Sequence, residues 1–432
     1  MRFKLISWLI IILGLTAAGI HFYPKIIKKD IPVHGGQLNA AILGKILTIN
    51  PFDDREFYNE QLCDNVLFPK LIRLDLQGRV RPRLARSWAV DTSSHQIIIK
   101  INNDYRWNNG DPLTAYDVRA TYHTLMGRNE LLYETLRRVQ KMEVLDSSTC
   151  VMTYKADRPW QTLLDVPVLP ESIIGQKTDG QSLIRFFEKG GWGCGPYVLD
   201  SFTDEGIVLS ANPYFRSAPV YFDTVAIHFY EETDTLLRDI EALRIDVVYS
   251  VSPVLAEKVE SLPGFRLQTT TEPGYTCIAW NLAQPHLQSR RLRQLLTIAM
   301  DRQTMVDGIL LGYGTVNDVL AYPGHPCYAM QQTYAYNEEK AKTELNNLLP
   351  ALNTGNEDGL YPALKLITNK ENEIHIDFLN NITQYIQFLG IEVENEVLQW
   401  ETMMDRIEQG AFDGVIMDWV ESDELEYFNL FD

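Results

Sequence analysis

The sequence predicts an α/β protein, because buried-strand patterns alternate with amphipathic helix patterns along most of its 432 residues. Residues 97–101 form a β-branched run of the kind found in buried strands. Thr114 and Asp117 then have the spacing of a capping box, which begins a helix. Near the C-terminus, a helix pattern over residues 400–409 precedes the apolar segment AFDGVIMDW, which predicts another buried strand.

Glycine-rich and polar segments separate the other predicted elements of the N-terminal half. Residues 34–50 predict a short strand pair, residues 61–74 predict a helix, and residues 82–101 lead into the isoleucine-rich strand. The segment GGWGCGPYVLDSF at 190–202 is not a dinucleotide-binding fingerprint, because that motif must open a helix. Its Pro-Tyr continuation predicts a strand instead.

The C-terminal half predicts a series of amphipathic helices. Apolar side chains between residues 292 and 300 repeat on one helix face. A second helix begins near Asp301 and is closed by Gly312. Helices are also predicted over residues 334–347 and 378–389, and the latter precedes a half-exposed strand.

The N-terminus has the layout of a secretory signal peptide. Arg2 and Lys4 precede an apolar run over residues 5–20, which ends in small residues. Adding residues 21–23 makes the run long enough for an uncleaved membrane anchor, so cleavage and anchoring both stay open. The first cysteine is Cys63, so no lipid-accepting cysteine follows the run. This favours a Gram-negative periplasm, with the protein either soluble after cleavage or tethered to the inner membrane.

Charge and motifs exclude several function classes. The formal net charge is −18, which argues against a nucleic-acid partner, since phosphate binding needs clustered cations. No HExxH, G-x-S-x-G or P-loop motif occurs, so we expect no enzyme. His325 and Cys327 form the only close His/Cys pair, and two ligands do not make a metal site. We therefore expect no metal and no cofactor.

The cysteines follow no CxxC pattern, and their number is odd, so spacing assigns no disulfide. Most of them are expected to be small buried hydrophobic side chains. The five are Cys63, Cys150, Cys194, Cys277 and Cys327.

Residues 84–118 contain LA-x-S-W followed by W-x-x-G-x-P-L-T-A-x-D-V. This motif resembles the family 5 extracellular solute-binding proteins, which capture oligopeptides, dipeptides and similar ligands for ABC importers, and further motifs follow in the order of that family. G-C-G-P-Y is similar to the G-T-G-P-Y turn of the family, with Cys194 in place of threonine, and A-N-P-Y-F follows at 211–215. YAYNEEKAKTELNN at 334–347 is similar to another family helix. A further motif is matched by Asn281, Arg293, Ala299, Met300, Asp301, Arg302 and Gly312, while Leu295 replaces its first alanine.

The resemblance implies a two-lobe periplasmic-binding-protein fold, with mixed sheets, a hinge and an extra subdomain in the first lobe. Residues 1–29 would be the signal peptide or membrane anchor with a basic linker. Residues 30–52 and 190–274 would form the first lobe, 53–189 the additional subdomain, and 275–432 the second, ligand-side lobe. The family usually continues beyond the segment that ends here at Asp432, so we expect the second lobe to be truncated and incomplete. A natural short variant and a truncated or split reading frame both stay open.

The resemblance also implies binding rather than catalysis. A peptide would lie between lobes that close by hinge motion, and a monomeric protein would deliver it to an inner-membrane ABC permease. The family places a carboxylate for the ligand's amino terminus shortly after a tryptophan that matches Trp419. A solvated acidic turn is the alternative reading of this segment. The candidate ligand-binding residues are Asn50, Tyr58, Trp280, Asn281, Trp419, Glu421 and Asp423, with Glu424 as a further acid.

Two rival functions stay open. The same fold could bind a non-peptide ligand such as a nickel chelate, haem or a sugar. Alternatively, the chain could be a membrane-anchored interaction protein or a non-functional remnant. An acid in the second lobe that holds an amine would favour peptides.

Overall fold

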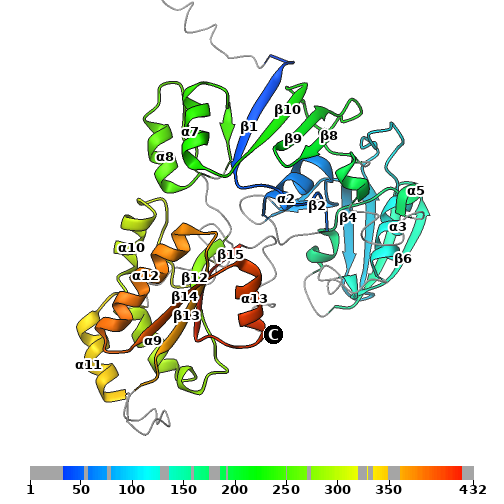
Figure 1. The fold of residues 1–432 in the computed structure, drawn as a ribbon. Helices are drawn as coiled ribbons and strands as arrows, with labels where there is room; N and C mark the ends of the chain where they lie inside the picture. Colours follow the sequence, from blue (N-terminus) through cyan, green and yellow to red (C-terminus); the bar gives the residue numbers. More distant parts are fainter. Residues whose placement is uncertain are drawn as a thin grey trace, which may run out of the picture.

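The computed structural model describes two lobes, each built on its own mixed sheet (Figure 1). Residues 1–29, for which the sequence predicts an export segment, lie outside the described ranges. Within those ranges, no helix is long and apolar enough to cross a membrane. The structure describes residues 33–52, 57–74, 79–126, 136–156, 160–174, 185–190, 193–249, 251–269, 274–319, 328, 334–348 and 361–420.

The first lobe contains a five-stranded sheet in the order β11-β1-β10-β9-β8. Strand β1 pairs in parallel with β10 and with β11, which are far away in the sequence. The predicted strand pair over residues 34–50 is therefore wrong, because this segment supplies a single strand whose partners come from later in the chain. Helices α7 (Thr233–Glu241) and α8 (Pro253–Glu260) belong to this lobe. The strands are β1 (Gln37–Leu43), β8 (Tyr197–Thr203), β9 (Gly206–Ala211), β10 (Thr224–Tyr230) and β11 (Val247–Val248).

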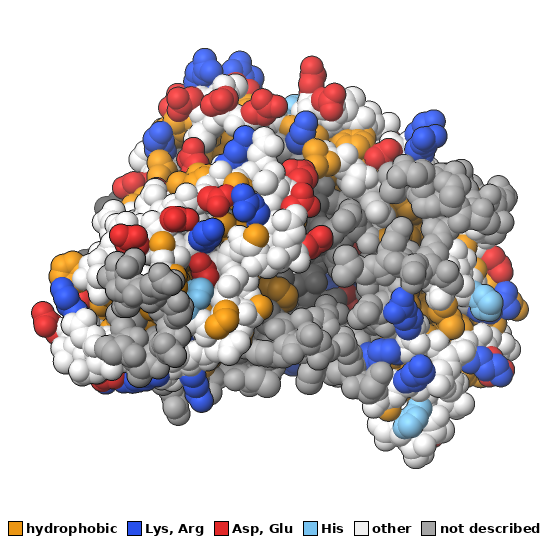
Figure 2. All heavy atoms as spheres, turned by 60° about the horizontal axis from the view of Figure 1, so that its bottom comes forward, with side chains coloured by type: hydrophobic (Ala, Val, Ile, Leu, Met, Phe, Trp, Pro, Cys, Tyr) orange, Lys and Arg blue, Asp and Glu red, His pale blue; other side chains and the backbone are white. Residues whose placement is uncertain are grey.

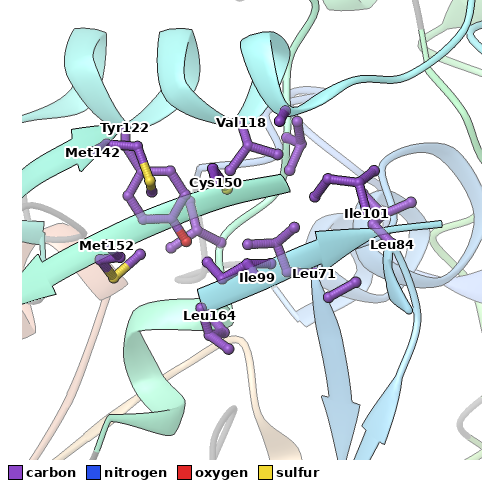
Figure 3. Packing of buried hydrophobic residues seen from close by; sticks show 14 of the residues in the cluster. Leu71, Leu84, Ile99, Ile101, Val118, Tyr122, Met142, Cys150, Met152 and Leu164 are labelled. Carbon is purple, nitrogen blue, oxygen red and sulfur yellow. The ribbon is translucent and has the colours of Figure 1, made fainter. Parts of the chain in front are cut away.

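An antiparallel four-stranded sheet, β4-β5-β7-β6, forms a separate core beside the first lobe (Figures 1 and 3). In the isoleucine-rich strand, Ile97 and Ile99 are buried while Ile98 is 41% exposed, so only one face of the run is buried. Helix α3 (Ala115–Leu125) packs on the buried face. The predicted capping box of Thr114 and Asp117 is confirmed, with contacts in both directions. The strands are β4 (Ala85–Asp91), β5 (Gln96–Ile101), β6 (Val139–Asp146) and β7 (Thr149–Tyr154), and short helices η2 (Gln161–Leu164) and α5 (Glu171–Ile174) follow.

Tyr122 gives this core one buried polar contact. Its side chain is fully buried, its hydroxyl donates to the carbonyl of Leu163, and burial raises the pKa of the hydroxyl far above its ordinary value. We expect Tyr122→Phe to lower the free energy of unfolding by about 1–2 kcal/mol, because the buried carbonyl loses its donor. Tyr116→Phe on the same helix, where the side chain is 40% exposed, should change it by less than about 0.5 kcal/mol. Urea unfolding followed by circular dichroism measures both, and equal effects would contradict the assignment.

The predicted helix over residues 61–74 is correct only in its first half. Helix α2 (Phe57–Leu62) continues into a π-helical turn, η1 (Cys63–Leu67), and the chain then extends into β2 (Ile72–Leu74). Strand β2 pairs antiparallel with β3 (Val80–Pro82). The residues of β2 therefore pair with another strand, and their helix-like spacing in the sequence does not predict this pairing.

The G-C-G-P-Y segment is a structural joint between the subdomain and the first lobe. Cys194 lies in the subdomain core, while the amide of Gly195 donates to the carbonyl of Leu67, 3.1 Å away. The side chain of Asn212, from the A-N-P-Y-F motif, donates to the carbonyl of Gly195 at 2.8 Å. The predicted strand after the motif is confirmed as β8.

The second lobe has a four-stranded sheet in the order β12-β15-β13-β14, with helices on both faces (Figure 1). One face packs against α9, α11 and α12, and the other packs against α13. The predicted helices of this half are confirmed, and Asp301 caps α10 as expected. The elements are β12 (Gly274–Trp280), η3 (Pro285–Leu287), α9 (Arg290–Ala299), α10 (Arg302–Ile309), α11 (Glu338–Leu348), β13 (Leu364–Asn369), α12 (Glu373–Phe388), β14 (Val393–Leu398), α13 (Trp400–Glu408) and β15 (Gly414–Val420).

Most cysteines within the described ranges are buried, as expected from the sequence. Cys63, Cys150 and Cys194 are buried, and Cys277 is half-buried. Burial raises the pKa of Cys150 and of Cys194 to about 12, which makes both thiols unreactive at neutral pH. Cys327 and His325 lie outside the described residues.

Candidate functional site

The carboxyl ends of the parallel strands in both sheets define the candidate site. In the first lobe β1, β10 and β11 are parallel, and in the second lobe β13, β14 and β15 are parallel. Ligands of open α/β sheets bind outside the carboxyl ends of the strands. Figure 1 shows β1 running toward the second lobe. Figure 2, in which the bottom of Figure 1 is turned forward, shows a surface that is hollowed near its centre. The hydroxyl of Tyr313, after α10, approaches Glu260 of α8 to 3.5 Å, so the two lobes touch beside this site.

Two tyrosines mark the first-lobe edge. Tyr58, on α2, lies with its hydroxyl 3.5 Å from the carbonyl of Leu43 at the end of β1. Its ring contacts Tyr249, which directly follows β11, in an edge-on arrangement with centroids 6.3 Å apart. Tyr249 is 45% exposed. The sequence contains no signal for it, because a single aromatic residue after a two-residue strand forms no pattern.

Asn50 holds the loop that leads from β1 to α2. Its side-chain oxygen accepts from the amide of Phe52 at 3.1 Å, which makes an Asx turn. Both its backbone groups bond to the side chain of Asn59, which is fully buried on α2. Asn50 thus positions the segment that carries Tyr58, and its contact with a ligand stays a prediction.

Trp419 lies at the carboxyl end of β15, opposite Tyr275 of β12. Both residues are half-buried. The predicted acids Glu421 and Asp423 come directly after this strand and lie outside the described residues, as does Glu424. Their contact with a ligand therefore stays a prediction.

Trp280 and Asn281 lie at the other end of the same strand pair. Trp280 is opposite Gly414, five residues before Trp419 along β15, which corresponds to about 17 Å. Trp280 packs in the core on the α12 side of the sheet. Trp419 lies two residues after Met417 on β15 and therefore on the same face, which is the α13 side. The sequence predicts both tryptophans in one ligand site, and the structure does not bring them together.

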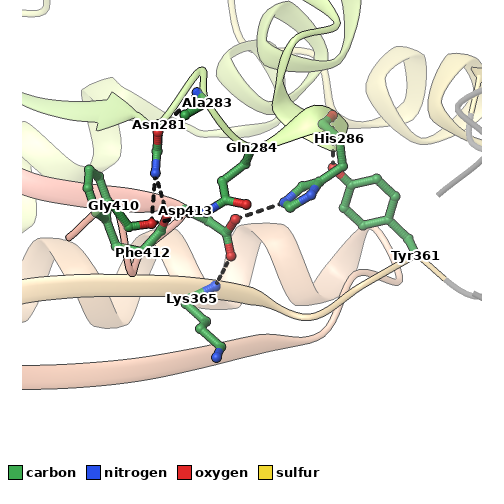
Figure 4. Close-up of polar contacts among 9 residues, drawn as sticks. All are labelled: Asn281, Ala283, Gln284, His286, Tyr361, Lys365, Gly410, Phe412 and Asp413. Carbon is green, nitrogen blue, oxygen red and sulfur yellow. Dashed lines mark hydrogen bonds and ion pairs between the residues drawn. The ribbon is translucent and has the colours of Figure 1, made fainter. Parts of the chain in front are cut away.

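The amide of Asn281 joins two turns at this far end (Figure 4). Its nitrogen donates to the carbonyls of Gly410 at 3.2 Å and Phe412 at 3.0 Å, while its oxygen accepts from Ala283. The next residue of the second turn, Asp413, is buried. This geometry gives Asn281 a structural role, and its contact with a ligand remains a prediction.

Asp413 forms the centre of the network in Figure 4. One carboxylate oxygen lies 2.8 Å from Nε2 of His286, and the other accepts from the amide of Lys365 at 2.8 Å. Tyr361 packs edge-on against the His286 ring and donates to its carbonyl at 3.4 Å. The network ties the loop after β12 to the starts of β13 and β15, away from the carboxyl edge.

A second His–Asp pair lies at the carboxyl edge itself. Nε2 of His375, in the first turn of α12, is 2.9 Å from Oδ1 of Asp418, which also accepts from the Thr276 hydroxyl at 2.6 Å. Partial burial alone would raise the pKa of Asp418, but the contacts with His375 and Thr276 outweigh it and hold this pKa below its ordinary value. The sequence did contain a signal for this pair. His375 occupies an apolar-face position of α12, and Asp418 interrupts an apolar strand.

These edges offer aromatic and carboxylate groups rather than a metal-binding set. Among the residues that the structure describes, no three His, Cys, Asp or Glu side chains are close enough together to hold a metal ion. A two-lobe α/β fold with facing carboxyl edges defines a class of proteins that bind a solute between lobes.

Comparison with known proteins gives the family. The model of the bacterial extracellular solute-binding proteins, family 5, matches residues 79–431, so the chain belongs to that family. The oligopeptide-binding protein AppA of Bacillus subtilis is 25% identical over 421 residues, which cover 93% of this chain and 76% of AppA.

Solved structures share the fold. The structure of Bacillus subtilis AppA in complex with a nonapeptide matches with a TM-score of 0.75 at 23% identity, covering 90% of this chain and 80% of that one. NikZ from Campylobacter jejuni in complex with Ni(L-His) matches with a TM-score of 0.75 at 19% identity, covering 90% and 78%. At these identities the likeness shows the two-lobe fold alone, and it extends over most of the chain.

Proposed function

We propose that this protein captures a peptide in the periplasm and delivers it to an ABC permease in the inner membrane. The observation that carries the proposal is the pair of facing carboxyl edges, with Tyr58 and Tyr249 on one lobe and Trp419 and Tyr275 on the other. Aromatic side chains from both lobes can enclose a chain-like ligand with little loss of conformational entropy. Membership of family 5 and the similarity to an oligopeptide-binding protein support a peptide as the ligand.

Polar recognition in this proposal comes from the segment that follows β15. Glu421 and Asp423 directly follow the edge that bears Trp419, and either carboxylate could hold the amino terminus of the ligand. An extended peptide beside a strand end gains backbone hydrogen bonds of the strand-addition type. Closure of the lobes on the ligand would then present both lobes to the permease.

Thermal unfolding of the purified chain tests the proposal, with and without a mixture of di- to octapeptides. A ligand at one hundred times its dissociation constant adds about 2.7 kcal/mol to the free energy of unfolding, so the midpoint should rise. A cooperative transition that does not move with any peptide would overturn peptide capture. The nickel–histidine complex serves as a second probe, since NikZ, which shares the fold, was solved with it.

Trp419→Phe should weaken binding of the best peptide about tenfold, because the larger indole ring is lost at the ligand-side edge. Trp280→Phe, at the opposite end of the strand pair, should weaken it less than about threefold. Isothermal titration calorimetry measures both affinities. Trp88→Phe in the antiparallel subdomain is the control for general effects on folding. A larger loss in Trp280→Phe than in Trp419→Phe would place the ligand at the other end of β12.

A further inference from the structure

Asp418 presents one carboxylate oxygen at the edge that carries Trp419. Its Oδ1 atom makes the contacts with Thr276, at 2.6 Å, and with His375, at 2.9 Å. No described residue forms a hydrogen bond or an ion pair with Oδ2. The side chain is 43% exposed and lies on the α12 face of the sheet, whereas Trp419 lies on the opposite face of the same strand end.

The partners of Asp418 are themselves fixed. His375 is only 4% exposed, and its Nδ1 atom lies 3.0 Å from the side-chain oxygen of Asn369 at the end of β13. Asn372 caps the same turn by accepting from the His375 amide at 3.2 Å. The imidazole is thus fixed through Nδ1, its Nε2 atom lies close to the carboxylate, and the Thr276 hydroxyl donates to the same carboxylate oxygen before a ligand arrives. Groups that are oriented in advance lose less entropy on binding.

We propose that Asp418 is a specificity-determining residue, whose Oδ2 atom pairs with an alkylammonium or guanidinium group on a side chain of the ligand. This inference rests on the proposed function and names the chemical class that the site prefers. A cation gains a charge-assisted hydrogen bond from an oriented carboxylate, whereas an anionic group at the same place is repelled. No lysine or arginine of the described segments lies within ion-pair distance of Asp418, and His375 is the basic side chain beside it.

Calorimetry with two small peptides, trilysine and trialanine, tests the inference. The ratio of their affinities reports the contribution of side-chain cations. In the unmodified protein, trilysine should bind tenfold or more tightly than trialanine. Asp418→Asn should reduce that ratio below threefold. The difference between the ratios of the two proteins should shrink at high salt, because the attraction is electrostatic.

A matched control removes the same charge from a neighbouring site. Asp377 is exposed on α12, two residues beyond His375, and so points elsewhere around the helix. Asp377→Asn should keep the ratio of the unmodified protein. Ratios that persist in Asp418→Asn, or that never reach tenfold in the unmodified protein, would overturn the inference while leaving peptide capture intact. Failure of every peptide to bind the unmodified protein would instead overturn the proposed function.

His375 is assigned as a positioning residue, and two substitutions separate this role from simple packing. His375→Leu should lower the charge-dependent ratio, because the carboxylate loses the contact that orients it. His375→Gln keeps a donor that can reach Asp418 and should retain most of the ratio. Equal ratios in both variants would show that the imidazole does not position Asp418.

Discussion

Gly195→Ala is expected to destabilise the first lobe by about 4 kcal/mol, a loss of the size that single substitutions reach only through severe packing or backbone effects. A Cβ atom at Gly195 would lie 2.0 Å from the carbonyl oxygen of Val66 and 2.7 Å from its carbon. Both groups are backbone, so neither can rotate away. The backbone at Gly195 is not in the left-handed region, so the requirement for glycine is one of contact alone.

Urea unfolding and the yield of soluble protein measure this effect. Gly308→Ala is the control, because Gly308 is exposed on α10 and a Cβ there meets nothing within 4 Å. That substitution should stabilise the protein by up to about 1 kcal/mol through helix propensity. A free energy of unfolding for Gly195→Ala within about 1 kcal/mol of that of the unmodified protein would contradict the close approach of Gly195 to the π-helical turn η1.

Asp413→Ala is expected to have the second large effect, a loss of about 3–4 kcal/mol confined to the second lobe. Removing the carboxylate leaves the amide of Lys365 without its side-chain acceptor and His286 without its partner. Both contacts are buried or nearly so, and breaking a buried pair from one side costs more than the pair itself contributes. Asp413→Asn keeps an oxygen for the amide of Lys365 and should cost about half as much.

A double-mutant cycle with His286→Ala separates the pair from its surroundings. The coupling between Asp413→Ala and His286→Ala should reach about 1 kcal/mol or more, since residues in one network are not additive. Asp405→Asn on α13 removes an exposed acid and should change stability by less than about 0.5 kcal/mol. Additive effects of the two network substitutions would mean that the His286 contact contributes little to the lobe.

Several motifs that resemble the family have structural roles in this chain. Arg302 donates to the carbonyls of Tyr334 at 2.7 Å and Asn317 at 3.2 Å, and pairs with Asp318 at 2.6 Å. Arg293 donates to the carbonyl of Leu287 at 2.6 Å. These contacts fix the loops around α9 and α10, so the motifs report the fold, while the identity of the ligand depends on the edge residues.

Local patterns predicted much of the secondary structure. The capping box at Thr114, the cap at Asp301 and the amphipathic face of α12 were all readable, because each depends on residues within a few positions of one another. The sequence predicts a strand pair over residues 34–50 and a helix over the residues that form β2, and both predictions are wrong. Both errors arose where the partner strand lies elsewhere in the sequence.

The candidate site was predictable only in part. Trp419 and Tyr58 lie at facing edges. Trp280 lies at the opposite end of the β12–β15 pair, about five residues along the strands from Trp419. His375 and Asp418 are separated by more than forty positions, and neither spacing nor composition connects them. A buried histidine on an apolar helix face was the one available signal.

By itself the sequence determined the α/β class, most helix starts and the resemblance to family 5, because caps, periodicity and turn residues act over short distances along the chain. Only the tertiary structure decided that β1 pairs with β10, which end of β12 lies beside Trp419, and that His375 lies next to Asp418. The physical reason is that strand register and the meeting of side chains from different elements are set by long-range packing. A one-residue change of register would have placed each of these side chains on the other face of its sheet.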